Sequence, residues 1–164
     1  MAAAAAQSAL PSTQLHSRPK PALPPLCATV FAHSTPNPPL PPQFSRDSKA
    51  NGALMRITPL AVWGCGLSDD ELAAAAIEDA KLSHPNPVTQ QANAIYCIAI
   101  KSLIRRPGDA EAAIQAAKRW ASSHACEEVR GWLRDALGTA PGPAANRMIG
   151  FVRYGFFYAF RELK

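Results

Sequence analysis

The sequence predicts an all-α domain that begins at about residue 48, and two observations carry the prediction. Apolar residues after this point recur at spacings of three and four, the period of an α-helix, whereas no stretch alternates as a half-buried strand does. Capping residues and prolines stand where these helices would begin, and glycines or prolines stand where they would end. A chain of 164 residues has room for one such domain.

The first expected helix has the clearest start signal. Ser68 is followed three residues later by Glu71, which is the pattern of a capping box. The helix should end near Leu82, because two prolines closely follow and disfavour helical backbone in the residues before them. Pro87 can begin a second helix that ends at Arg106 and is largely buried. Its apolar face is formed by Val88, Ala92, Ile95, Ala99 and Leu103.

Three further helices are expected. Asp109 can cap the first of them, and the Ser122-Ser123 pair can begin the next, which Gly138 ends. The last should lie between Ile149 and Leu163, with Val152, Phe156, Ala159, Phe160 and Leu163 on one stripe. Such a stripe is typical of a core-facing helix; the alternative is a membrane-surface helix with Arg153, Arg161 and Lys164 as its basic residues.

Residues 1–47 are expected to form a disordered leader outside this domain. The tract is rich in proline, contains the alanine run Ala2–Ala6, and has no acidic residue before Asp47. It cannot bury enough apolar surface to offset the entropy of ordering it. The lack of acids partly fits a transit peptide, although the prolines disfavour the usual amphipathic helix. We therefore expect a cytoplasmic protein, with a plastid or mitochondrion as the alternative.

Charge and cysteine usage exclude several classes. The net charge is +5, but the basic residues are scattered, so no nucleic-acid partner is expected. No run of eighteen apolar residues is present, so no transmembrane span is expected. The four cysteines are far apart and form no zinc-binding pattern. The Asp69-Asp70 pair could be a metal site, but its place at a helix start favours a capping role.

Two short segments are candidates for ligand binding. Glycine accepts positive φ, so the Asn51-Gly52 pair can form a tight turn that exposes backbone N–H groups. The prolines of Ser83–Pro87 hold His84 in a rigid turn between two helices. Together these segments could bind an anionic ligand that carries a ribose. The plainer alternatives are a simple turn, a solvated histidine and, at Arg56, an exposed charge.

Three motifs resemble a known family. Ser48–Leu60 is similar to the GNGxxMRxxPL segment of the ADP-ribosylglycohydrolases, which include the enzyme that removes ADP-ribose from dinitrogenase reductase. Leu82–Pro87 is similar to the (T/S)HPxP turn of that family, and the helix pattern Ala94–Leu103 follows it as expected. Residues 150–163 resemble the GFV…A(F/L)..L helix. The resemblance spans residues 48–164, with the motifs in the family order.

The resemblance implies an orthogonal multi-helix bundle that binds ADP-ribose or an ADP-ribosylated protein. The family hydrolyses the glycosidic bond of ADP-ribosyl groups with the help of two Mg²⁺ ions. Carried over to this sequence, Asn51 and Gly52 would line the ADP-ribose site and His84 would approach the ligand. Met55 and Arg56 would fix the loop, Met55 by packing and Arg56 by hydrogen bonds to neighbouring carbonyls.

The departures from the family pattern concern the metal. Neither the TDD-type segment nor the DxD(T/S) segment that binds Mg²⁺ is found, and Ala50 replaces the glycine before Asn51. Mg²⁺ needs hard oxygen ligands, and the acids present are placed for helix caps and surfaces. We therefore expect a partial family domain with no catalytic residue, no metal ligand and little hydrolysis of its own. The alternatives are ADP-ribose binding without turnover, or an interaction fragment that self-associates through the apolar faces of 88–103 and 156–160.

Overall fold

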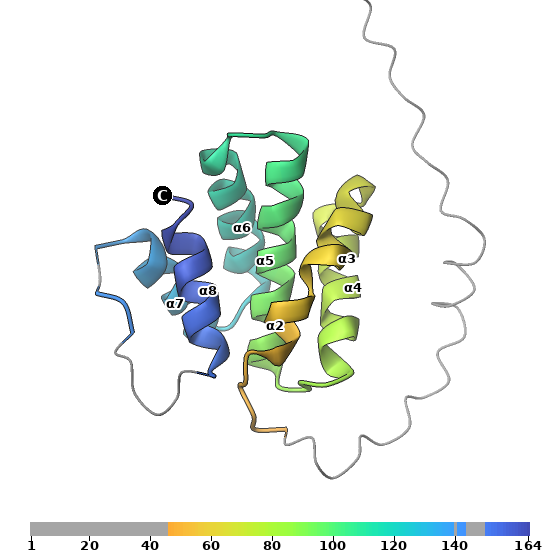
Figure 1. Ribbon diagram of the computed structural model, residues 1–164, viewed down its shortest axis with the longest axis vertical. Helices are drawn as coiled ribbons and strands as arrows, with labels where there is room; N and C mark the ends of the chain where they lie inside the picture. The colour runs from red at the N-terminus through yellow and green to blue at the C-terminus, as the bar shows by residue number, and fades with distance from the viewer. Residues whose placement is uncertain (1–45, 140, 144–149) are drawn as a thin grey trace, which may run out of the picture. The chain divides into compact units, whose positions relative to one another are not determined.

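The computed structural model describes residues 46–139, 141–143 and 150–164 (Figure 1). These residues contain seven α-helices and one 3-10 helix, and they confirm the all-α prediction. The expected leader and its targeting role lie outside the described residues, except for Arg46 and Asp47. In chain order the elements are α2 (Gly52–Arg56), α3 (Thr58–Trp63), η1 (Gly64–Gly66), α4 (Asp69–Lys81), α5 (Pro87–Arg105), α6 (Ala110–His124), α7 (Glu127–Leu137) and α8 (Val152–Arg161).

Helix α5 is the centre of the domain, and α2, α3, η1, α4, α6, α7 and α8 all pack against it (Figure 1). Its sequence explains this position, because small residues such as Ala92, Ala94 and Ala99 are buried and let neighbouring helices approach closely. Ile95 and Ile98 are fully buried between them. The prediction that this helix is largely buried is confirmed.

The local start signals work as the sequence indicates. Ser68 and Glu71 form the predicted capping box of α4. The side chain of Asn86 caps α5 by accepting a hydrogen bond from Val88 N, and Pro87 is the first helical residue. Asp109 caps α6 through Ala112 N, at 2.9 Å. These caps satisfy N–H groups that have no partner within their helix.

The boundary between α6 and α7 differs from the prediction. The Ser122-Ser123 pair lies inside α6, and α7 begins only at Glu127. The Ser122 hydroxyl donates to Arg119 O within the same helix, at 2.7 Å, instead of capping the next one. The start of α7 is fixed by a tertiary contact, since Cys126 N donates to Gln91 Oε1 of α5 at 2.8 Å.

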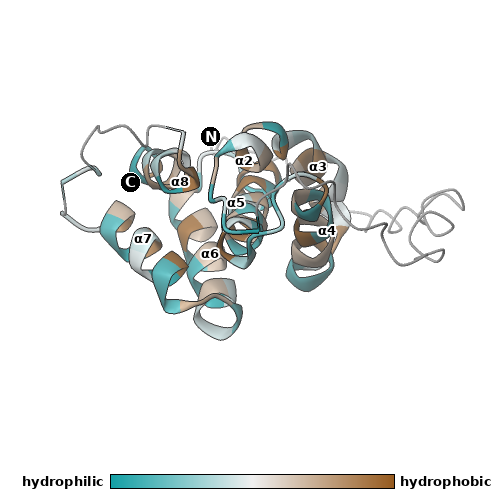
Figure 2. Ribbon diagram, turned by 90° about the horizontal axis from the view of Figure 1, so that it is seen from below, coloured by the Kyte–Doolittle hydropathy of each residue, from teal (hydrophilic) through white to brown (hydrophobic). Residues whose placement is uncertain are grey.

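The hydrophobic core includes the two apolar faces, on α5 and α8, through which self-association was the alternative. Ile95 and Ile98 of α5 and Phe156 and Phe160 of α8 have no exposed surface. The rings of Phe156 and Phe160 lie 4.8 Å apart, and Trp132 of α7 packs against Phe156. These buried residues are not available for the alternative of self-association through the two faces, because the neighbouring helices of the same domain cover them. Figure 2 shows hydrophilic and hydrophobic sides on α4 and α7, as expected of helices that cover a core.

An ion pair between a buried lysine of α5 and a partly exposed aspartate connects α4 to α5. Lys101 is only 6% exposed; its ammonium pairs with Asp69 and donates to Leu67 O at 3.0 Å. Asp69 therefore serves to position the start of α4. Within the part of the chain that the structure describes, no helix has both the length and the apolar composition needed to cross a bilayer.

Candidate functional site

Two segments from opposite ends of the domain meet at the start of α2. Asn51 N donates to Gly150 O at 2.8 Å, and Val152 N donates to Lys49 O at 2.7 Å. These bonds make an isolated antiparallel bridge between Ala50 and Phe151. The start of α2 is thereby held beside the start of α8 (Figure 1).

The imidazole of His84 lies directly on Gly52. A Cβ at Gly52 would be 2.7 Å from His84 Cε1 and 3.1 Å from His84 Nε2, closer than side chains normally approach. Among the described glycines only Gly108 has positive φ, so the predicted reason for a glycine at position 52 is wrong. Gly52 is helical backbone, and it is glycine because the histidine ring occupies the space of a side chain. We call Gly52 and His84 together the Gly52–His84 site.

The side chain of Asn51 turns toward α8. A Cβ at Gly155 would lie 2.8 Å from Asn51 Oδ1 and 3.0 Å from Asn51 Nδ2, so the amide packs on the glycine of α8. Asn51 Oδ1 is buried and has no hydrogen-bond partner among the described residues. A buried acceptor without a partner costs about 1–3 kcal/mol. Asn51 thus adjoins the Gly52–His84 site, with an amide group wedged between α2 and α8.

Arg56 connects α2 to the end of α4. Its Nη1 donates to both carboxylate oxygens of Asp79, at 2.8 and 2.6 Å. Its Nη2 donates to the carbonyl oxygen of Asp79 at 2.8 Å and to Ser83 Oγ at 3.0 Å. The planar guanidinium suits such multiple contacts. Arg56 therefore holds the turn that carries His84.

Ser83 continues this network to the histidine. Its Oγ lies 2.9 Å from His84 Nδ1. Because a guanidinium can only donate, Ser83 accepts from Arg56 and keeps its own proton available for Nδ1. This arrangement favours the tautomer in which Nε2, next to Gly52, carries the ring proton. Burial, and then the charge of Arg56, lower the pKa of His84, so the neutral ring is favoured.

Met55 does not pack as expected. Its side chain is 77% exposed, so the expected role of fixing the loop by packing is corrected. The helical geometry explains the difference: the buried positions of α2 are Ala53 and Leu54, and Met55 follows them on the outer side.

The acidic residues do not form a site that fits magnesium. All twelve lie within the described ranges. There, no three His, Cys, Asp or Glu side chains come close enough to hold a metal ion. Asp79, beside the Gly52–His84 site, is bound by Arg56, and Glu128 is bound by Lys49 at 2.7 Å. A two-metal site needs several carboxylate oxygens free to converge.

The family comparison agrees with the three motifs. A family model described as ADP-ribosylglycohydrolase matches residues 4–161. The chain belongs to the ADP-ribosylglycohydrolase family. No curated protein and no solved structure matches the chain. The resemblance is thus confirmed. The residues around the Gly52–His84 site lie in the three segments of this ADP-ribosylglycohydrolase relative that resemble the family motifs, 48–60, 82–87 and 150–163.

The residues that support the site could not be assigned their roles from the sequence. Ser83 stands in the (T/S)HPxP turn but was given no role, and Asp79 carries no signal of its own, because a partner for Arg56 could not be chosen among the acids without the fold. Gly155 did carry a signal: a glycine inside a helical pattern often marks a close approach by another group.

Proposed function

We propose that this ADP-ribosylglycohydrolase-family chain binds ADP-ribose, or an ADP-ribosyl group on a protein, at the Gly52–His84 site, with little or no hydrolysis by the chain alone. One observation carries the binding proposal: the imidazole rests on an exposed glycine at the point where two family motifs meet. The third motif supports it, because its first residues pair with the backbone just before Gly52.

The network behind His84 gives the proposed interaction its chemistry. With Ser83 donating to Nδ1, the His84 Nε2–H group is a neutral donor suited to a phosphate or ribose oxygen. Gly52 adds a backbone N–H at the first helical position, where such groups have no partner within the helix. Arg56 acts as a positioning residue, since its guanidinium already binds Asp79 and Ser83.

The proposal of little hydrolysis rests on what the carboxylates already do. Cleavage of a glycosidic bond passes through an oxocarbenium-like state and needs a carboxylate or a metal-bound water at the anomeric carbon. Asp79 is neutralised by Arg56, and Asp69 pairs with Lys101. Glu71 closes the cap of α4. Magnesium would supply an activated water in the family reaction, but these carboxylate oxygens are engaged in structural contacts and do not fit the ion.

Binding is tested by titrating the purified chain with ADP-ribose and following heat and amide NMR shifts. We expect shifts at Gly52 and at the imidazole of His84, with affinity lowered about tenfold in His84→Ala, the loss of one hydrogen bond to a charged group. His124→Ala is the matched control, because His124 lies at the far end of α6 and should not alter affinity. Absence of heat and of shifts at millimolar ADP-ribose rejects the binding proposal.

Turnover is tested separately. The chain is incubated with an ADP-ribosylated protein and Mg²⁺, and free ADP-ribose is measured. We expect no release above the rate without protein. Release that disappears in His84→Ala and on addition of a chelator would show that the chain hydrolyses the bond, and would leave the binding proposal intact.

A second candidate function is association through the outer side of α2 and α3. Met55, Val62 and Trp63 are 77%, 54% and 45% exposed, which is unusual for large apolar residues. Sedimentation should then detect a dimer that Trp63→Glu dissociates. A concentration-independent monomer contradicts this candidate.

A further inference from the structure

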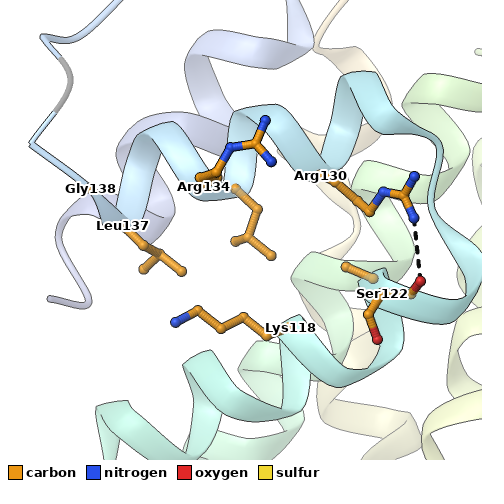
Figure 3. Close-up of a pocket in the computed structure, with 8 residues that line it drawn as sticks. Lys118, Ser122, Arg130, Arg134, Leu137 and Gly138 are labelled. Atoms are coloured by element: carbon orange, nitrogen blue, oxygen red, sulfur yellow. Dashed lines mark hydrogen bonds between the residues drawn. The ribbon is translucent and has the colours of Figure 1, made fainter.

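A pocket lies between α6 and α7, and none of its residues belongs to the Gly52–His84 site (Figure 3). Its volume is about 330 Å³, at the lower end of the range for small-molecule sites. The residues that line it are Lys118, Ala121 and Ser122 of α6, Arg130, Leu133, Arg134 and Leu137 of α7, and Gly138.

The pocket has an apolar floor and a cationic rim. Ala121 and Leu133 are 2% and 4% exposed and belong to the core, so they form the apolar floor. Lys118 extends its ammonium from α6 toward α7, and the guanidinium groups of Arg130 and Arg134 stand along α7 (Figure 3). Both helices thus contribute cationic side chains to the lining of the pocket.

The positive charge at the rim is only partly neutralised. Glu127 is shared by Arg130, at 3.1 Å, and Arg134, at 3.3 Å. Within the described residues Lys118 has no ion pair. The three cationic side chains of the lining, Lys118, Arg130 and Arg134, are therefore balanced only by the carboxylate of Glu127, which leaves an excess of two positive charges. The carbonyl oxygens at the end of α7 would repel an anion, but Lys164 Nζ donates to Gly138 O there at 3.2 Å.

We infer that this pocket binds a small organic anion that carries a carboxylate or phosphate on an apolar body. The anionic group lies at the rim, against Lys118 and Arg134, and the apolar body covers Ala121, Leu133 and Leu137. A guanidinium has five N–H donors and matches either anion in a two-pronged arrangement. A neutral apolar ligand would make no ionic contact with the rim, and a bare inorganic anion would make no apolar contact with the floor.

The test compares four probes on the full chain by amide NMR: 1-naphthyl phosphate, 1-naphthoate, 1-naphthol and inorganic phosphate. We expect the phosphate ester, the carboxylate or both to shift Gly138 and Leu133 and to bind at least about tenfold more tightly than naphthol or phosphate. The comparison of ester with carboxylate identifies the anion. ADP-ribose is added in a separate titration, so that shifts here and shifts at His84 are told apart.

Charge-reversal variants complete the test. Lys118→Glu and Arg134→Glu should each weaken binding about tenfold, and neither should unfold the protein, because Lys118 is exposed and the Arg134 side chain is 71% exposed. Arg119→Glu is the matched control, since it makes the same charge change one residue away and does not line the pocket. Equal binding of naphthol overturns the inference, as does binding unchanged in both variants. An acidic helical peptide that binds where both naphthyl anions fail would overturn it in favour of a protein partner.

Discussion

Replacing Gly52 by alanine tests the contact on which the candidate site depends. The new Cβ would lie 2.7 Å from His84 Cε1, whereas ordinary contacts begin at 3.4 Å. The imidazole or the start of α2 must therefore move by about 0.7 Å (3.4 − 2.7). A displacement of this size is enough to stretch the 2.9 Å contact between Ser83 Oγ and His84 Nδ1 beyond the usual hydrogen-bond range.

Stability is a poor measure of this change. Alanine is favoured over glycine in a helix by roughly 0.5–1 kcal/mol, which offsets part of the clash. We therefore expect the melting temperature of Gly52→Ala to change by only a few degrees, about the effect of 1 kcal/mol in a domain of this size.

The informative measurements are the NMR signal of the His84 Cε1–H group and the affinity for ADP-ribose. Both should change in Gly52→Ala, with affinity lowered about five- to tenfold, because a misplaced imidazole loses one hydrogen bond. Gly66→Ala is the matched control, since a Cβ there meets nothing within 4 Å. A Cε1–H signal with the wild-type position and the wild-type pH titration in Gly52→Ala would refute the contact.

Four further predictions follow from the same structure. Because the pKa of His84 is lowered in the folded protein, the contribution of the neutral imidazole to stability is complete above the unfolded pKa of about 6.5 and is lost as the pH falls toward the folded pKa. The free energy of unfolding of His84→Gln should therefore fall less in acid than that of the wild type. Urea titration at each pH measures it. Asp69→Asn should cost about 1–3 kcal/mol, because it leaves the Lys101 ammonium buried without its carboxylate. Phe156→Ala should cost about 3–5 kcal/mol by leaving a cavity in the core; urea unfolding measures both. Cys97 should resist alkylation at pH 8 in the folded protein, because burial and then Asp79 raise the pKa of its thiol to about 12; peptide mass spectrometry measures the label.

Three of these predictions have a control in the same domain. Glu78→Gln breaks an exposed ion pair with Lys81 and should cost less than about 0.5 kcal/mol. Val62→Ala removes an apolar side chain that is 54% exposed and should also cost little. Cys126 is partly accessible and should react with the reagent that spares Cys97. For His84, a pH profile unchanged by the substitution would contradict the lowered pKa.

The helices could be predicted because their signals are local. The Ser68–Glu71 box, the Asn86-Pro87 start and the Asp109 cap each depend on residues within one turn, and each is found in the structure. The start of α7 could not be predicted, because it depends on a bond from Cys126 N to Gln91, a residue of another helix.

The candidate site was predictable in its members but not in its arrangement. The motifs named Gly52 and His84, but the proposed turn geometry was wrong, because the reason for the glycine lies in a neighbouring side chain. Met55 was expected to pack because it matches the family motif; the helix register places it outside. Arg56 makes several bonds to α4, and only the folded chain shows that Asp79 is its partner.

The bridge between Ala50 and Phe151 also sets an order of events during synthesis. A ribosome makes the Gly52–His84 segment early, yet the backbone that holds its start is among the later residues to emerge. Joining such distant residues requires closure of a long loop, so it tends to come late in folding. A nascent chain that has exposed α4 and α5 but not α8 would already have the histidine turn while lacking the partner of residue 50. Ligand added during translation should therefore be retained only by chains that have released α8.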